Sequence, residues 1–306
     1  MLKIKVPATS ANLGPGYDTF GLALNLFNEY IFNLDDSKSE LSVQIIDNNN
    51  LNLNLKEEDN LILNTVKYLK EIYPDKIRTS NLEIKALLKY PINRGLGSSA
   101  NAIIGTIKGL DELFNLNLTK DEILKAALKL EGHPDNIVPT LSGGFTISKV
   151  ENEEISYEKF TISKDFKILL LIPDFAIKTI DARRVLNNHI EIKHASQNIA
   201  NASLLSAGLI LGDLSLIKKG SHDYIHQTKR LAINKKLEKL FNCLKDKLSC
   251  PYFLSGSGST IIFISNKEFG QEKEIINKTT DKYGIVNYLI ETRVNNKGII
   301  IKEDGD

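Results

Sequence analysis

The chain has 306 residues, of which 42% are hydrophobic and 25% are charged, a balance typical of a globular protein long enough for two domains. Its formal net charge of +1 gives no reason to expect nucleic acid, an anionic membrane or an acidic polymer as a partner. With no transmembrane-length apolar run, no signal-peptide pattern and two cysteines (Cys243 and Cys250) at no zinc spacing, we expect a cytoplasmic protein with reduced thiols.

The chain opens with apolar residues that alternate with lysines over residues 2–6, which predicts a half-buried strand. A loop rich in turn formers follows at residues 7–18, with the sequence Pro-Ala-Thr-Ser-Ala-Asn-Leu-Gly-Pro-Gly-Tyr-Asp. Taken alone, this loop is a connection between strands in which Asn12 and Asp18 bond their own backbone.

The next elements are also predicted from local patterns. Strands are expected at residues 19–26, 29–34 and 41–46. The asparagine-rich stretch 47–54 is expected to be a solvated loop, and residues 61–73 form an amphipathic helix with Asp59 as its N-cap.

The most informative stretch is Pro-Ile-Asn-Arg-Gly-Leu-Gly-Ser-Ser-Ala-Asn at residues 91–101, between an extended run (80–90) and a helical pattern. Gly95 and Gly97 permit positive φ and a close backbone approach to a ligand, and the serines lie where helix amides attract phosphate. The simpler interpretation is a turn followed by a serine N-cap. The stretch matches neither a Walker A loop nor a dinucleotide-binding turn.

A second cluster of polar residues follows a predicted helix at residues 120–130, for which Thr119 is the N-cap. The cluster is Glu-Gly-His-Pro-Asp-Asn at residues 131–136, and it gathers two carboxylates, an imidazole and an amide. A single Glu or His near a helix end is usually a cap or a solvated side chain, so spacing alone assigns no role here.

The second half of the chain begins after a polar hairpin or linker at residues 148–164, where we place the domain boundary, giving domains 1–155 and 156–306. Thr179 and Arg183 are four apart and would share one face of a helix. The other predicted elements are a buried strand at 168–172, helices at 193–211 and 231–247, a Gly-Ser turn at 255–260 between two strands, and a last helix with two strands.

The loop at 91–101 resembles the phosphate loop of the GHMP kinases, Pro-x-x-x-Gly-Leu-Gly-Ser-Ser-Ala. Asn101 departs from the family pattern, which usually has a small residue there, and we expect it to tune the loop. The segments at 7–18 and 131–136 resemble those of the homoserine kinases, and Arg183 and Arg230 lie in weaker matches.

The resemblance implies an α+β fold with two domains, the first like ribosomal protein S5 and the second ferredoxin-like, with the active site between them. It implies ATP-dependent phosphorylation of the side-chain hydroxyl of L-homoserine, in threonine biosynthesis. It also implies Mg²⁺ as cofactor and allows a homodimer.

By the same resemblance, the nucleotide is bound by Asn60, Pro91, Arg94, Gly95, Leu96, Gly97, Ser98, Ser99 and Ala100. The residues implied for the amino-acid substrate are Asn12, Asp18, His133, Thr179, Arg183 and Arg230. Glu131, with Ser98 or Ser99, is implied as the oxygen ligand set of Mg²⁺, and Asn136 is placed beside the transferred phosphoryl group together with Glu131 and Ser98.

Residue chemistry agrees with a small zwitterionic substrate. Arg183 and Arg230 could bind its carboxylate, while Asp18, Asn12 and His133 could receive its ammonium group. No aspartate is an evident base, so we expect transfer without one, although Asp135 has the right chemistry. Two alternatives remain: another GHMP small-molecule kinase, such as a mevalonate or diphosphocytidyl-methylerythritol kinase, and a GHMP-fold sensor without catalysis.

Overall fold

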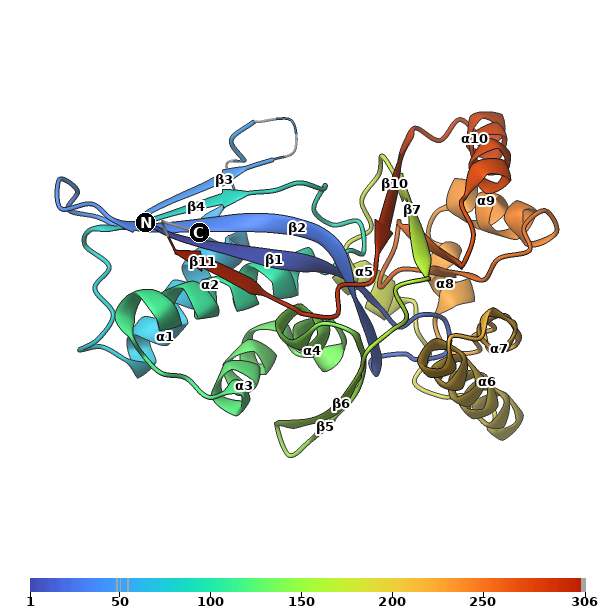
Figure 1. Ribbon diagram of the computed structural model, residues 1–306, viewed down its shortest axis with the longest axis horizontal. Helices are drawn as coiled ribbons and strands as arrows, with labels where there is room; N and C mark the ends of the chain where they lie inside the picture. The colour runs from blue at the N-terminus through green and yellow to red at the C-terminus, as the bar shows by residue number, and fades with distance from the viewer. Residues whose placement is uncertain (48, 50, 54, 304–306) are drawn as a thin grey trace.

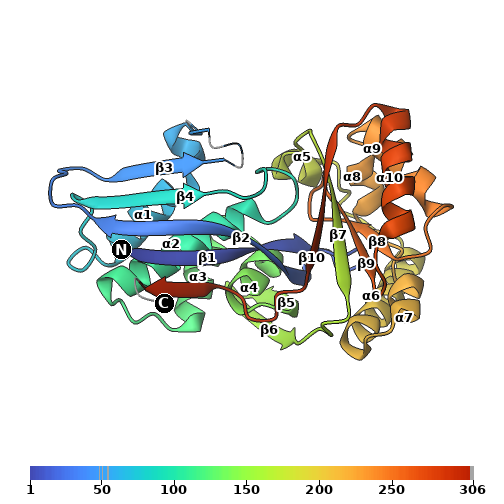
Figure 2. The same cartoon turned by 45° about the horizontal axis from the view of Figure 1, so that its top comes forward.

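The structure is a computed structural model that describes residues 1–47, 49, 51–53 and 55–303 (Figure 1). The molecule is elongated, and two β-sheets with their helices follow one another along its long axis (Figures 1 and 2). Largely antiparallel sheets combined with helices confirm the predicted α+β class. Within the described residues, no helix is long and apolar enough to cross a membrane.

The first sheet contains seven strands within the described ranges, in the order β11-β1-β2-β4-β3, with β5 paired to β2 and to β6. The strands are β1 (Leu2–Ala11), β2 (Phe20–Leu34), β3 (Ser42–Ile46), β4 (Leu82–Leu87), β5 (Phe145–Glu151), β6 (Glu154–Phe160) and β11 (Ile300–Glu303). The prediction of two strands at 19–26 and 29–34 is wrong, because β2 is continuous. Asn28 stays in the ladder opposite Val6, and its side chain accepts the Lys89 amide at 2.9 Å.

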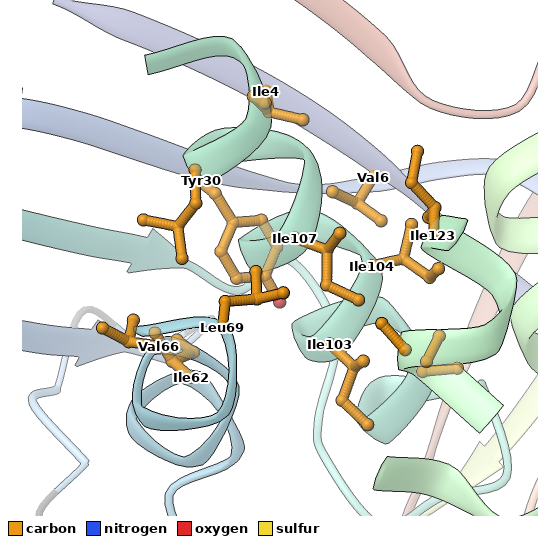
Figure 3. Close-up of a cluster of buried hydrophobic side chains, with 14 of the residues drawn as sticks. Ile4, Val6, Tyr30, Ile62, Val66, Leu69, Ile103, Ile104, Ile107 and Ile123 are labelled. Atoms are coloured by element: carbon orange, nitrogen blue, oxygen red, sulfur yellow. The ribbon is translucent and has the colours of Figure 1, made fainter. Parts of the chain in front are cut away.

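Four helices pack on one face of this sheet (Figure 2). They are α1 (Leu61–Ile72), α2 (Ser98–Phe114), α3 (Lys120–Glu131) and α4 (Pro134–Ser142). Figure 3 shows the apolar core where they meet the strands, including Ile4, Val6, Leu69, Ile104 and Ile123. Apolar packing therefore holds α2 along its length and fixes the loop at its N-terminus.

Local capping signals were mostly sufficient to place the helix starts. Thr119 caps α3 as predicted, with reciprocal bonds to Glu122 that make a capping box. The predicted cap of α1 is wrong by one residue, since Asn60 accepts the Leu63 amide and Asp59 ends a preceding 3-10 turn, η1 (Glu57–Asp59).

The second sheet has the order β10-β7-β9-β8, with strands β7 (Lys167–Pro173), β8 (Tyr252–Leu254), β9 (Ile261–Ser265) and β10 (Asn287–Arg293). The remaining helices are α5 (Thr179–Arg184), α6 (Ile192–Leu211), α7 (Leu214–Lys219), α8 (Gln227–Leu231), α9 (Lys235–Lys245) and α10 (Gly270–Tyr283). The helix predicted at 231–247 is shorter, because Asn234 caps α9 by accepting the amides of Lys236 and Leu237.

The first sheet contains strands from both sides of residue 155. Strand β6 pairs with β5 across that position, and β11, near the C-terminal end, pairs with β1. The two-domain division stays a prediction. Of the predicted loop at 47–54, residues 48, 50 and 54 lie outside the described residues.

Candidate active site

The loop between β4 and α2 is held from behind by its own carbonyl groups. The Leu96 carbonyl accepts the Thr9 amide at 3.2 Å, and the Gly95 carbonyl accepts the Ser255 hydroxyl at 2.6 Å. Both partners lie far away in the sequence, one in β1 and the other in the turn between β8 and β9. The loop is therefore fixed between the two halves of the molecule.

The two glycines of this loop are required by its backbone. Gly95 has φ +75° and Gly97 has φ +67°, which other residues rarely adopt. A Cβ on Gly95 would lie 2.1 Å from the Ser255 carbonyl oxygen, well inside van der Waals contact. The glycines let the loop take this shape and let the two segments touch.

The outer side of the loop presents backbone donors. Among the described residues, none accepts a hydrogen bond from the amides of residues 95–99. Gly97 is the N-cap of α2 and supplies no capping side chain, so the positive end of the helix dipole is uncovered. This arrangement fits a phosphate group and favours the functional interpretation over a plain N-cap.

Three oxygen-bearing side chains lie beside these amides. The Ser99 hydroxyl donates to the Glu131 carboxylate, and the Ser98 hydroxyl is buried with no partner among the described residues. Burial raises the pKa of the Glu131 carboxyl. The described residues contain no cluster of three or more His, Cys, Asp or Glu able to hold a metal. Even so, an unpaired hydroxyl next to a carboxylate fits the oxygen ligands that Mg²⁺ takes alongside a phosphate.

The turn from α3 into α4 places the second polar cluster. Gly132 ends α3 in the left-handed conformation, and Pro134 starts α4 one residue after His133. His133 Nδ1 lies 2.9 Å from Asp135 Oδ1. Burial alone lowers the His133 pKa, but the bond to Asp135 and the nearby Glu131 outweigh it, so the pKa is raised.

The loop at 7–18 meets α5 through an ion pair. Arg183 donates to both carboxylate oxygens of Asp18, at 2.8 and 3.0 Å, and to the Tyr17 hydroxyl at 2.9 Å. Asn12 Oδ1 accepts the Asp18 amide at 2.9 Å, which holds Asp18 at φ +52°. Arg183 and Asp18, predicted to bind opposite ends of a substrate, therefore bind each other here.

Arg230, on α8, has a different environment. Its side chain is buried, donates to the Gly256 carbonyl at 2.8 Å and lies 5.2 Å from the centre of the Tyr17 ring. Burial lowers its pKa. No carboxylate among the described residues pairs with it. A buried cation without an acidic partner attracts an anionic ligand.

One pocket gathers most of the predicted site. It is lined by Asn12, Asp18, Gly95, Gly97, Ser98, Ser99, Glu131, His133, Asn136, Thr179, Arg183 and Arg230, all of which the sequence predicts. It is also lined by Ala11, Asn93, Asp135, Gly256 and Ser257. The donor amides, the carboxylate of Glu131 and the two arginines therefore border the same space.

The other predicted nucleotide residues do not line this pocket. Leu96 and Ala100 are buried in the core, and Asn60 caps α1. Pro91 opens the loop, while Arg94 turns toward the second sheet, where Nε donates to the Pro173 carbonyl at 3.1 Å. Pro91, Arg94, Leu96 and Ala100 contribute to the shape of the loop, whereas Asn60 lies at the start of α1.

A larger, more apolar pocket adjoins the first and shares Asn93, Ser98 and Ser99 with it. Its other lining residues include Ile62, Leu88, Ala102 and Lys178. Apolar walls next to a phosphate-binding turn suit the base and ribose of a nucleotide. The helix start at Ser98 therefore lies between a space for a nucleotide and a space for a smaller polar molecule.

Sequence reasoning assigned no site role to Thr9, Tyr17 or His226, whereas the family resemblance implies that the turn at 255–260 closes over the active site. Thr9 bonds Asn136, Tyr17 contacts both arginines, and the Ser255 hydroxyl bonds the Gly95 carbonyl. His226 lies beside Arg230 and donates to the Gly14 carbonyl at 2.8 Å. The only available signal was position, since Thr9 and Tyr17 belong to the loop segment at 7–18 and His226 to the segment of Arg230.

Known proteins similar to this chain are GHMP kinases, and several of them are homoserine kinases. Residues 60–144 match the GHMP kinase N-terminal domain model, and residues 204–284 match the GHMP kinase C-terminal model. The chain is 36% identical to homoserine kinase of Halothermothrix orenii, over 99% of this chain and 96% of that protein. It is 33% identical to homoserine kinase of Clostridium botulinum, over 99% and 100%. The crystal structure of homoserine kinase from Cytophaga hutchinsonii superposes with a TM-score of 0.84 at 25% identity, covering 98% of this chain and 97% of that one.

Proposed function

The chain belongs to the homoserine kinases of the GHMP kinase superfamily, and from that premise we propose that it transfers the γ-phosphoryl group of ATP to the side-chain hydroxyl of L-homoserine. The product, O-phospho-L-homoserine, belongs to threonine biosynthesis. The observation that carries the proposal is a single pocket in which a phosphate-binding turn faces a buried arginine that has no acidic partner among the described residues.

The phosphate chain of ATP binds at the amides of residues 95–99, at the start of α2. These donors are fixed before the ligand arrives, because the loop carbonyls are already bonded behind them. Positioning and charge neutralisation are the main requirements of phosphoryl transfer, and a rigid set of amides supplies both. The adenosine part occupies the adjoining apolar pocket.

Glu131 and the hydroxyls of Ser98 and Ser99 would hold Mg²⁺. The support is the buried, unpartnered Ser98 hydroxyl and the contact between Ser99 and Glu131, within the described part of the chain. When bound, the ion neutralises charge on the phosphates.

The amino-acid substrate lies between the arginines and Asp18. Arg230, joined by Arg183, binds the carboxylate, and Asp18 with Asn12 receives the ammonium group. The Asp18–Arg183 pair opens to do so, at low cost, because both side chains are about one-third exposed. His133 and Thr179 complete the wall.

In the transfer step, the substrate hydroxyl oxygen forms a bond to the γ-phosphorus while the bond to the β–γ bridging oxygen breaks. ADP leaves with that electron pair, and the hydroxyl proton is lost late, to a phosphoryl oxygen. Asn136, which lines the pocket beside the loop, donates to the transferred group. No side chain is assigned as the base.

Three further features belong to the proposal. A cytoplasmic location is supported by two free cysteines, Cys243 and Cys250. The two-domain division and a homodimer follow the family. Exposed apolar residues of α6, such as Ile199 and Leu211, are consistent with a dimer contact, which light scattering after gel filtration would test.

The experiment is a coupled ADP-release assay with L-homoserine, L-threonine, L-serine, mevalonate and galactose. Turnover with L-homoserine well above all the others is expected. Preference for mevalonate or galactose would replace the substrate, and absence of turnover with every acceptor would support a non-catalytic sensor.

A further inference from the structure

A threonine of the first strand reaches the pocket through another side chain. Thr9 Oγ1 donates a hydrogen bond of 2.7 Å to Oδ1 of Asn136, across 127 positions of sequence. Thr9 is completely buried in β1, and its amide bonds the Leu96 carbonyl of the phosphate loop. The hydroxyl is therefore fixed relative to the amides that bind phosphate.

The phosphate loop is shaped to permit this contact. A Cβ on Gly97 would lie 2.0 Å from Thr9 Oγ1 and 2.9 Å from Asn136 Oδ1. Any side chain at position 97 would displace one of the two partners. Strand β1, the loop and α4 thus converge at one point beside the pocket.

The bond engages the oxygen end of the Asn136 amide. With Oδ1 accepting from Thr9, Nδ2 is the end of this pocket-lining amide that bonds no acceptor among the described residues, so it is the end available to a ligand. Nδ2 carries two N–H donors, which suit the oxygens of a phosphoryl group. In the flipped amide, Oδ1 would face those oxygens and repel them.

We propose that Thr9 is a positioning residue for phosphoryl transfer, which holds the Asn136 amide with its Nδ2 donors toward the transferred group. The proposal rests on the proposed function, since it concerns the same pocket. Loss of the hydroxyl lets the amide flip, so transition-state stabilisation falls while the substrates still bind.

The test compares Thr9→Val, which keeps the shape and removes the hydroxyl, with Thr9→Ser, which keeps the hydroxyl. We expect Thr9→Val to lower kcat by about 10- to 100-fold with both KM values within about twofold, and Thr9→Ser to stay within about threefold of the unchanged protein. Thr106→Val is the matched control, because Thr106 is buried in α2 and its hydroxyl has no partner among the described residues.

A double-mutant cycle separates positioning from a structural effect. If Thr9 acts through Asn136, Thr9→Val lowers kcat in the unchanged protein but not in the Asn136→Ala background. An equal loss in both backgrounds, or an unchanged kcat in Thr9→Val, would overturn the inference. Where Thr9→Val folds poorly, as judged by its thermal midpoint, Thr9→Ala is measured in the same cycle with the same outcomes.

The kinase activity and the role of Thr9 can be refuted separately. If the unchanged protein does not phosphorylate L-homoserine, the proposed function fails. If it does, and the kcat of Thr9→Val equals that of Thr106→Val, only the role of Thr9 fails. Binding of a fluorescent ATP analogue to each variant provides a reading independent of turnover, and we expect it to be unchanged.

Discussion

The Asp18 carboxylate and the Arg183 guanidinium face each other as a two-bond ion pair, with Oδ1 2.8 Å from Nη2 and Oδ2 3.0 Å from Nη1. This geometry imitates the contact that a substrate carboxylate would make with Arg183. A ligand with one positive and one negative end can satisfy both partners as they separate, whereas a ligand with one charge leaves a partner unpaired. The pair thereby favours zwitterions.

The first prediction concerns Asp18→Asn. The unchanged protein should prefer L-homoserine to 4-hydroxybutanoate, which lacks the ammonium group, and the substitution should reduce that preference by about tenfold or more, since a charged hydrogen bond is lost. The measurement is kcat/KM for both acceptors. A preference that Asp18→Asn leaves intact would mean that Asp18 does not contact the ammonium group.

The second prediction concerns the arginines. Arg230→Ala should raise the KM for L-homoserine by about 30-fold to several thousand-fold, because roughly 2–5 kcal/mol is lost when a desolvated carboxylate is left unpaired. Arg183→Ala should have a smaller effect, since Arg183 is about one-third exposed. Steady-state kinetics should show the KM for ATP nearly constant in both variants. A parallel rise in the KM for ATP would contradict the assignment.

The third prediction concerns the phosphate loop. Gly95→Ala should weaken ATP binding at least tenfold, because its Cβ would lie 2.1 Å from the Ser255 carbonyl and would push the loop away. Gly212→Ala is the matched control: its φ is also +75°, but its Cβ would meet no atom of the described residues within 4 Å. It should cost only the backbone strain, about 1–2 kcal/mol of unfolding free energy, with normal ATP binding. Equal ATP affinity in the two variants would show that the contact with Ser255 is unimportant.

The elements that could be predicted from the sequence are those that depend on contacts between residues close together in the chain. Local signals predicted α3, because Thr119 and Glu122 form a capping box within four residues, and they located the phosphate loop through its glycines. They failed at β2, where Asn28 interrupts the apolar pattern yet is held by the Lys89 amide, 61 positions away.

Long-range pairing within the site was beyond sequence reasoning. The residues that line the pocket were predicted through the family motifs, but their partners were not. Asp18 and Arg183 lie 165 positions apart, and nothing in either segment indicates that they bind each other. Asn101 also acts differently than expected. It is buried and bonds Val6, Pro7, Asn28 and Tyr30, so it anchors α2 to β1 and β2.

The fourth prediction concerns the absence of a base. Asp135→Asn keeps an oxygen for the bond with His133 and should lower kcat less than tenfold. Glu131→Gln, which removes a proposed ligand charge of Mg²⁺, should lower it by about 100-fold or more. Single-turnover rates with saturating ATP and L-homoserine, together with circular dichroism to check folding, measure both. A loss of several orders of magnitude in folded Asp135→Asn would identify Asp135 as a base.

The fifth prediction concerns pH and His226. This ring is completely buried, with Nε2 donating to the Gly14 carbonyl and Nδ1 3.4 Å from Nη1 of Arg230, so a proton on Nδ1 would oppose the guanidinium. Burial lowers the His226 pKa, Arg230 lowers it further, and Asp223 at 3.8 Å only partly offsets them. Because the folded pKa lies below the unfolded value of about 6.5, the stabilisation is complete above that pH and is lost as pH falls toward the folded pKa.

The unfolding free energy should therefore fall by at most about 1.4 kcal/mol per pH unit from this group. The variant His226→Gln keeps a donor for Gly14 but cannot titrate, so it should flatten the slope of unfolding free energy against pH, measured by urea titrations between pH 5 and 8. Equal slopes for the two proteins would show that His226 is not the group responsible.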